Sequence, residues 1–383
     1  MTKSINNQVE QIEISGIRKF FNLVSERKDV ISLTIGQPDF PTPTVVKEAA
    51  ILAVEENKTS YTANAGLPEL RHAVAQYMNE SYQTSIQGEQ VIITVGASQA
   101  IDVVCRSLLN TGDEVILPDP VYPGYEPLIK LAGATAVHVN TQQADFKLTA
   151  SLLERAITPQ TKCVILPYPS NPTGVSLDEE ECHKIAELVH KHNLFLITDE
   201  IYSALSYEKP HYSMARISKI KDQLIVINGL SKSHAMTGWR IGFLITPQWL
   251  TPHCIKVLQY NVSCASSISQ YAALAAVTKA QAAPIEMKQA YMTRRDFVYK
   301  KLINMGIEVI KPDGAFYFMV RIKSSKSSLE LALDLVERVG LALVPGDAFG
   351  EAGQGYLRLS YAYSLDTLAE GLSRLEAYLR LQK

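Results

Sequence analysis

Hydrophobic and polar positions follow one clear rhythm between residues 89 and 244. Short β-branched and apolar runs are separated there by longer amphipathic stretches. The short runs predict strands at residues 91–95, 114–117, 136–139, 162–166, 194–198, 224–228 and 241–245. The longer stretches predict helices that include residues 98–109, 123–131, 177–190 and 250–260. This alternation is typical of an α/β fold, in which helices cover both faces of a mixed, mostly parallel seven-stranded sheet.

The C-terminal part has a different pattern. Residues 282–305 read as one long helix, followed by helical patterns at 328–339 and 365–381. Short strands are expected between these helices, at residues 308–310, 315–320, 342–344 and 356–360. We therefore predict a large domain at residues 46–284 and a smaller α+β domain at residues 285–383. Residues 1–45 are too few to fold alone and are expected to join the smaller domain.

Composition excludes several classes of protein. The chain has 383 residues, of which 46% are hydrophobic and 20% charged, as in an ordinary globular enzyme. A formal net charge of -2 provides no basic face for nucleic acid. The first residues are polar, without the apolar region of a secretory signal, and no stretch approaches the ~20 apolar residues of a membrane span. Five scattered cysteines without a C-x-x-C pair predict reduced thiols and a cytoplasmic protein.

An acid and an amine each follow a predicted buried strand. Asp199 comes directly after the apolar run that ends at Thr198, and Lys232 follows the run that ends at Asn228. A lysine held beside a sheet edge is partly desolvated, which lowers its pKa and makes it a better nucleophile. Taken alone, each residue is more typical of a helix cap or an ordinary loop.

Two further segments are suited to phosphate. Arg240 follows Lys232 by eight residues and can bind phosphate through paired, charge-assisted hydrogen bonds. The run G-A-S-Q at residues 96–99 lies between a strand and a helix, where free backbone N–H groups can cradle an anion. Pyridoxal phosphate requires this combination: an amine for its aldehyde, a carboxylate for its pyridine nitrogen and an anion site for its phosphate.

Six longer runs carry a resemblance over nearly the whole chain. They are I-G-Q-P-D-F-P-T-P at residues 35–43, S-Y-T-A-N-A-G-L-P-E-L-R at 60–71, P-S-N-P-T-G at 169–174, D-E-I-Y at 199–202, S-K-S-H-A-M-T-G-W-R-I-G at 231–242 and Y-L-R-L-S at 356–360. In this order they resemble the class I aminotransferases, members of the fold-type-I group of pyridoxal-phosphate enzymes. The resemblance implies a homodimer whose large domain binds the cofactor.

The resemblance also implies a role for each matching residue. Lys232 would carry pyridoxal 5'-phosphate as a Schiff base and move the proton of the substrate. Arg358 would bind the substrate α-carboxylate, with Gly36 close to the substrate backbone and Asn171 also in contact with the substrate. The other cofactor contacts would be Asp199 at the pyridine nitrogen, Asn171 and Tyr202 at the phenolic oxygen, Tyr122 on the ring face, Ala97, Ser98, Ser231 and Arg240 at the phosphate, and Tyr61 from the partner subunit at that phosphate.

The substrate is suggested by departures from aspartate-specific relatives. Those relatives often carry a lysine where this chain has Ser98, and their stacking tryptophan is replaced by Tyr122. The runs at residues 96–102, 167–175 and 259–270 look like the N-acetyl-L,L-diaminopimelate aminotransferase branch. We therefore expect N-acetyl-L,L-diaminopimelate and 2-oxoglutarate as the physiological pair, with Ser15, Gly16 and Ile17 lining the pocket. A broad aspartate or aromatic aminotransferase remains the alternative.

Other functions fit the sequence less well. A carbon–sulfur β-lyase would share Lys232, Asp199 and Arg358 but release different products. A cofactor-binding regulator would need a basic DNA-binding domain before the large domain. A nicotinamide dehydrogenase would need a G-x-G-x-x-G turn opening a strand–helix unit, which the G-x-G at residues 353–355 does not provide. The eight histidines show no metal-ligand spacing, so no metal is expected.

Overall fold

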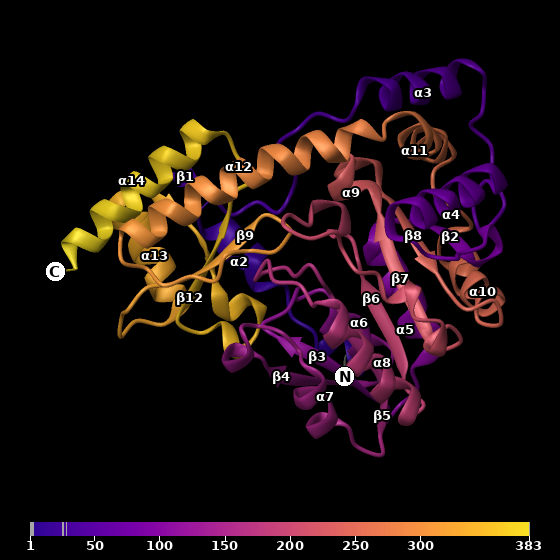
Figure 1. Ribbon diagram of the computed structural model, residues 1–383, viewed down its shortest axis with the longest axis horizontal. Coiled ribbons are helices and arrows are strands. Elements are labelled where there is room, and N and C mark those ends of the chain that lie inside the picture. The colour runs from indigo at the N-terminus through magenta and orange to yellow at the C-terminus, as the bar shows by residue number, and fades with distance from the viewer. Residues whose placement is uncertain (1–3, 25–26, 28, 383) are drawn as a thin grey trace.

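A seven-stranded sheet forms the centre of the computed structural model, which describes residues 4–24, 27 and 29–382. Its strand order is β2-β8-β7-β6-β5-β3-β4 (Figure 1). The strands are β2 (Val91–Val95), β3 (Glu114–Asp119), β4 (Thr135–Asn140), β5 (Thr161–Leu166), β6 (Phe195–Asp199), β7 (Leu224–Gly229) and β8 (Ile241–Ile245). Strand β8 runs antiparallel to both of its neighbours, β2 and β7, and the other strand pairs of this sheet are parallel. The predicted mixed, mostly parallel sheet is confirmed, and each predicted strand differs from the observed one by at most two residues at an end.

Two hydrophobic cores lie on opposite faces of this sheet. In β7, Leu224 and Val226 belong to one core, whereas Ile225 and Ile227 belong to the other. Successive side chains of a strand point to opposite faces of the sheet. Because both faces are covered by helices, the inner strands are apolar at almost every position. The helices that cover one face are α4 (Pro68–Tyr82), α8 (Glu179–Lys191) and α11 (Ser267–Lys279), and those on the other are α5 (Gly96–Leu108), α6 (Tyr125–Leu131) and α10 (Thr251–Val262).

The C-terminal part forms a separate core around a small antiparallel sheet of order β11-β12-β9. Its strands are β9 (Tyr317–Arg321), β11 (Val344–Pro345) and β12 (Tyr356–Ser360), and its helices are α12 (Ala282–Asn304), α13 (Ser328–Val339) and α14 (Leu365–Leu381). The N-terminal segment contributes to this part: α2 (Gly16–Val24) packs on β11, and β1 (Ile31–Ser32) pairs in parallel with β10 (Leu341–Ala342).

Two strand predictions in this part are wrong. Residues 308–310 pair with no strand among the described residues. Their apolar side chains instead anchor a connection, since Val309 packs on the small core and Ile310 on a core of the large sheet. The strand expected at residues 342–344 is divided at Leu343, because β10 pairs with β1 whereas β11 pairs with β12. The strand predicted at residues 315–320 is present, but it starts two residues later, at Tyr317.

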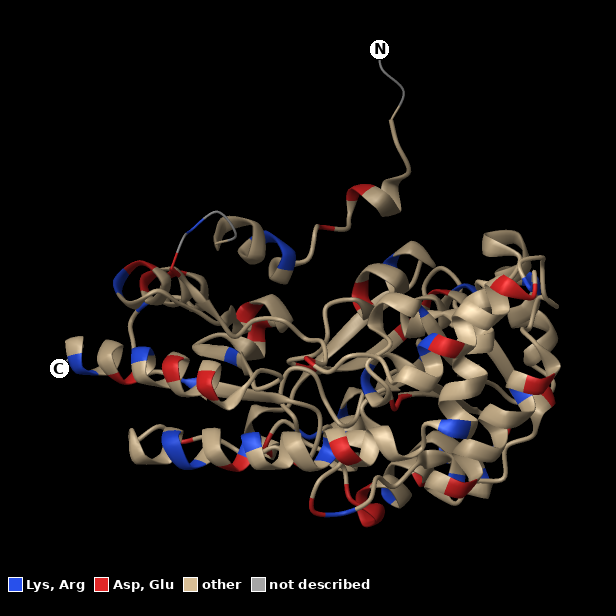
Figure 2. Ribbon diagram, turned by 90° about the horizontal axis from the view of Figure 1, so that it is seen from above, with Lys and Arg blue, Asp and Glu red and all other residues tan. Residues whose placement is uncertain are grey.

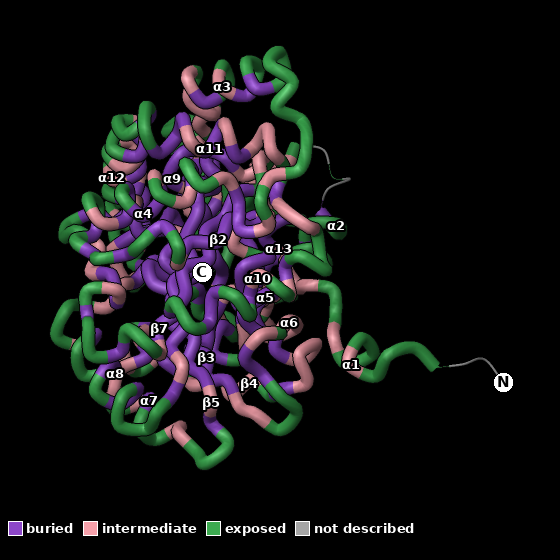
Figure 3. The backbone as a smooth tube through the Cα atoms, turned by 90° about the vertical axis from the view of Figure 1, so that its right-hand side faces the viewer, coloured by how far each residue is buried: buried purple, intermediate pink, exposed green. Residues whose placement is uncertain are grey.

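The surface and the interior separate clearly. The inner strands of the large sheet are buried and its edge strand β4 is partly exposed, whereas α1 (Asn7–Glu10) lies exposed at the outside (Figure 3). Basic and acidic residues alternate along the outer helices (Figure 2). All five cysteines are free and four of them are buried. Within the described ranges, no helix has both the length and the apolar character that crossing a membrane requires.

Candidate active site

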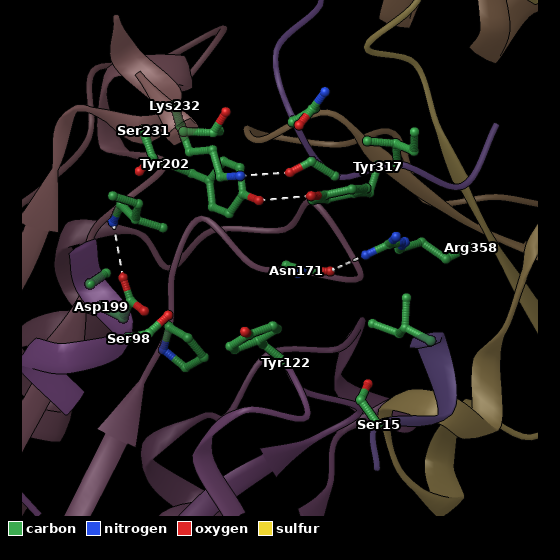
Figure 4. Close-up of a pocket in the computed structure, with 18 of the residues that line it drawn as sticks. Ser15, Ser98, Tyr122, Asn171, Asp199, Tyr202, Ser231, Lys232, Tyr317 and Arg358 are labelled. Atoms are coloured by element: carbon green, nitrogen blue, oxygen red, sulfur yellow. Dashed lines mark hydrogen bonds between the residues drawn. The ribbon is translucent and has the colours of Figure 1, made fainter. Parts of the chain in front are cut away.

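One cavity of about 660 Å³ opens at a single edge of the large sheet (Figure 4). Strands β2, β3, β5, β6 and β7 all end at this edge, and the antiparallel β8 begins there. The edge therefore gathers segments that are distant in sequence, as expected for an open α/β sheet. All predicted site residues except Tyr61 line the cavity: Gly36, Ala97, Ser98, Tyr122, Asn171, Asp199, Tyr202, Ser231, Lys232, Arg240 and Arg358.

Lys232 lies in the short helix α9 (Leu230–Ser233), which directly follows β7. Its Nζ atom donates a hydrogen bond to the backbone oxygen of Gly36 at 2.6 Å. Burial of the amine, followed by the nearby charges of Arg358 and Arg240, lowers the pKa of Lys232 to about 8. About a tenth of this amine is therefore neutral at pH 7, far more than for a solvated lysine, and the neutral form is the nucleophile.

Asp199 ends strand β6 and is buried. One carboxylate oxygen accepts a hydrogen bond from the Tyr125 hydroxyl at 2.7 Å, and the other accepts one from the Ile201 backbone N–H at 3.1 Å. Burial raises the pKa of Asp199 to about 6, against the opposing effect of these hydrogen bonds. A cationic group in the cavity would favour the ionised carboxylate. Tyr125 was not among the predicted site residues, although it stands only three residues after the predicted Tyr122.

Ala97 and Ser98 occupy the first turn of α5, where backbone N–H groups have no partners within the helix. Arg240 lies against this turn: a Cβ atom at Gly96 would collide with its guanidinium group, and the φ of +72° at Gly96 also favours glycine. The Arg240 Nη1 atom donates to the Thr237 backbone oxygen at 3.0 Å. Unpaired N–H groups and a guanidinium therefore meet at one place, which is suited to a phosphate.

Arg358 projects from β12 on the opposite side of the cavity and is 2% exposed. Its guanidinium donates to Asn171 Oδ1 at 2.8 Å and to the Thr34 backbone oxygen at 2.6 Å. It also lies over the rings of Tyr317 and Phe349, at 4.4 and 4.8 Å from their centroids. Its buried Nε atom has no hydrogen-bond partner within the described residues. A buried guanidinium that lies beside two aromatic rings and has no carboxylate partner among the described residues is suited to a carboxylate ligand.

Tyr317 contacts both Tyr202 and Arg358. It was not among the predicted site residues. Its hydroxyl shares a hydrogen bond of 2.7 Å with the Tyr202 hydroxyl, while its ring lies beside Arg358. A Cβ atom at Gly36 would collide with the same hydroxyl. The lack of a side chain at Gly36 therefore lets the loop that follows β1 pass close to Tyr317. Tyr317 lies on β9, next to β12 in the small sheet, which no local sequence pattern reveals.

The N-terminal segment closes the cavity on the side facing Tyr122 (Figure 4). Ser15 and Ile17 line it, as predicted. Gly16 does not, because it packs against Ala348. Arg18 and Phe21 of α2 also line the cavity and were not predicted.

Tyr61 lies apart from the cavity and is 87% exposed in the single chain. No cluster of three or more histidine, cysteine, aspartate or glutamate side chains suited to a metal occurs in the part of the chain that the structure describes.

Known proteins match this chain over most or all of its length. The family model described as aminotransferase class I and II matches residues 28–375. A probable N-acetyl-LL-diaminopimelate aminotransferase of Bacillus subtilis (strain 168) is 57% identical, over 99% of this chain and 96% of the relative. An aspartate aminotransferase of Pyrococcus abyssi is 38% identical, over 99% of both chains. The crystal structure of an aromatic aminotransferase from Pyrococcus horikoshii superposes with a TM-score of 0.90 at 36% identity, over 96% of this chain and 99% of the other.

Proposed function

This chain belongs to the class I and II aminotransferases, and we propose that it uses pyridoxal 5'-phosphate to move an amino group between N-acetyl-L,L-diaminopimelate and 2-oxoglutarate. The observation that carries the cofactor proposal is the amine of Lys232, which faces Asp199 and Arg358 within one cavity and has a pKa of about 8. The substrate proposal rests on the 57% identity to the Bacillus subtilis relative along almost the entire chain.

The cavity residues fit the cofactor. The first turn of α5 and Arg240 would hold the phosphate, together with Ser231. Asp199 would face the pyridine nitrogen, and a proton on that nitrogen would offset the burial that raises the pKa of this carboxyl. Asn171 and Tyr202 would contact the phenolic oxygen, and Tyr122 would pack on the ring.

The cofactor, when bound, supplies an aldehyde that bonds to amines and an aromatic ring that withdraws electrons from the substrate α-carbon. Lys232 has two tasks. Its amine would hold the cofactor through the aldehyde, and it would also accept the proton of the substrate α-carbon. A pKa of about 8 suits both tasks, because the amine can hold or lose a proton near neutral pH.

Arg358 would bind and orient the substrate. Its buried guanidinium would receive the α-carboxylate as a two-pronged partner, while the rings of Tyr317 and Phe349 hold its plane. Orientation of this kind brings the α-carbon to the Lys232 amine and excludes water from that contact.

A substrate panel tests the proposed reaction. We would compare the catalytic efficiency for N-acetyl-L,L-diaminopimelate, free diaminopimelate, aspartate and phenylalanine, each read as the absorbance change of the loaded enzyme. The acetylated compound is expected to be preferred. A clear preference for aspartate or phenylalanine, without use of the acetylated compound, would instead support the alternative of a broad aspartate or aromatic aminotransferase. Release of pyruvate, ammonia and thiol from a sulfur-containing amino acid would identify a carbon–sulfur lyase.

We also propose that the active enzyme is a homodimer in which Tyr61 reaches the phosphate of the other subunit. Apolar side chains beside this residue in the sequence are exposed in the single chain: Ile51, Leu52 and Val54 of α3 (Thr44–Glu55) are each at least 50% exposed. Surfaces of this kind are typical of isologous dimers. Sedimentation of the purified protein tests the proposal, and full activity in a monomer would contradict it.

The domain boundaries and the location of the enzyme are part of the same proposal. We assign residues 46–284 to the large cofactor-binding domain and residues 285–383 to the small domain. Residues 1–45 join the small domain, which the pairing of β1 with β10 and the packing of α2 on β11 support. The five free cysteines favour a reducing compartment, the cytoplasm.

A further inference from the structure

The positive and negative charges of the residues that line the cavity are unequal in number. Among the described residues that line it, four are basic, Arg18, Lys232, Arg240 and Arg358, and Asp199 alone is acidic. In the proposed reaction, Lys232 bonds the cofactor, Arg240 faces its phosphate and Arg358 receives the α-carboxylate. Arg18 remains without a task. A cation that lines a substrate cavity and has no anionic partner points to an anionic group of the ligand.

The local structure of α2 turns Arg18 toward the cavity. Arg18 and Phe21 are three residues apart in α2, so they share one side of the helix, and both line the cavity together with Ser15, which directly precedes the helix. The other side is anchored, because Phe20 and Val24 are buried in the small core. The helix is thus fixed by packing, while its cavity side is left to contact a ligand.

Arg18 is also free to bind. It is exposed, and no carboxylate lies within ion-pair distance of it among residues 4–24, 27 and 29–382. The adjacent Lys19 differs: it is paired with Glu13 at 2.6 Å and is not among the residues that line the cavity. The chain therefore offers two neighbouring cations, one committed to the protein and one facing the cavity.

We propose that Arg18 binds the second carboxylate of dicarboxylic substrates. The inference rests on the proposed function and extends it, because N-acetyl-L,L-diaminopimelate and 2-oxoglutarate both carry a carboxylate distant from the reacting carbon. One residue can then serve both half-reactions. The long stem of arginine reaches groups at different distances, and its planar fork binds a carboxylate through two hydrogen bonds.

The test compares substrates that differ only in the distal group. Glutamate and norvaline have the same chain length, but norvaline ends in a methyl group. We expect Arg18→Gln to lower the catalytic efficiency for glutamate by ~10–100-fold, in the range of hydrogen bonds to charged groups. Efficiency for norvaline should stay within about threefold, since no such bond is lost. The matched control is Lys19→Gln, which removes the same charge one residue away and should leave both efficiencies unchanged.

A binding measurement gives a readout independent of turnover. Glutarate and pentanoate are titrated against the cofactor-loaded protein and its Arg18→Gln variant. Glutarate should bind ~10–100-fold more weakly to the variant, with pentanoate binding unaltered. Equal losses for both ligands, no loss for either, or the same loss in Lys19→Gln would overturn the role of Arg18. The two proposals can be rejected independently. If the parent protein does not use the acetylated compound, the substrate proposal is wrong, but the protein can still discriminate glutamate from norvaline through Arg18.

Discussion

The two walls of the cavity are built in different ways. The wall at the sheet edge carries Asp199 and Ser231, both buried, at the ends of central strands that have neighbours on each side. The opposite N-terminal wall is α2, a helix of nine residues whose cavity-facing Arg18 is exposed. The first wall holds groups whose position the chemistry demands, whereas the second holds groups that contact the outer end of a substrate. Substitutions in α2 can therefore change the preference for substrates without disturbing the reacting groups.

The largest effect is expected at the sheet-edge wall. Lys232→Ala removes both the bond to the cofactor and the group that moves the proton, and proton transfer alone contributes ~10²–10⁴-fold. Turnover should fall by at least that factor for every substrate. Single-turnover absorbance measurements test this, with folding checked by circular dichroism. Substantial turnover in the variant would show that another group does this work.

The second effect distinguishes the two arginines that face the substrate. Arg358→Lys keeps the charge but loses the planar fork, so the Michaelis constant should rise ~10–100-fold for every amino acid. Arg18→Gln, in contrast, should affect only dicarboxylic substrates. Steady-state kinetics with glutamate, norvaline and phenylalanine separate the two patterns. If Arg358→Lys matched the parent for all three, Arg358 would not be the carboxylate site.

The pH dependence of cofactor capture tests the environment of the sheet-edge wall. Below a pKa of about 8 the Lys232 amine is mostly protonated and cannot attack an aldehyde. The rate of cofactor uptake by cofactor-free protein should therefore rise ~tenfold per pH unit below pH 8 and level off above it. Stopped-flow absorbance measures this rate. A rise that continues toward pH 10 would indicate an ordinary, solvated lysine.

The smallest effect is expected at Tyr317, which joins the two sides of the substrate site. Tyr317→Phe removes the hydroxyl bonded to Tyr202 but keeps the ring beside Arg358. Loss of one neutral hydrogen bond should lower the catalytic efficiency by about 3–10-fold. Tyr317→Ala also removes the support of Arg358, so it should raise the Michaelis constant further. Identical kinetics for the two variants would mean that the ring does not support the arginine.

The sequence predicted the sheet-edge wall better than the N-terminal wall. Asp199 is the last residue of an apolar strand and Lys232 comes three residues after the end of another, so their place at the sheet edge is a local property of the chain. Arg18 and Tyr317 have no such signal, because their positions depend on how α2 and β9 pack in three dimensions. The same reason explains the wrong strand at residues 308–310, whose adjacent apolar residues Val309 and Ile310 reach two different cores and pair with no strand among the described residues.

The central claim is that the Lys232 amine is the group to which the cofactor bonds, and peptide mapping tests it most directly. The cofactor-loaded protein would be reduced with borohydride, digested and analysed by mass spectrometry. Reduction makes the bond between an amine and the aldehyde permanent, so the modified residue can be located. The account predicts one modified peptide, with the added mass on Lys232. Modification of another lysine, or an active protein that carries no modification after reduction, would contradict it.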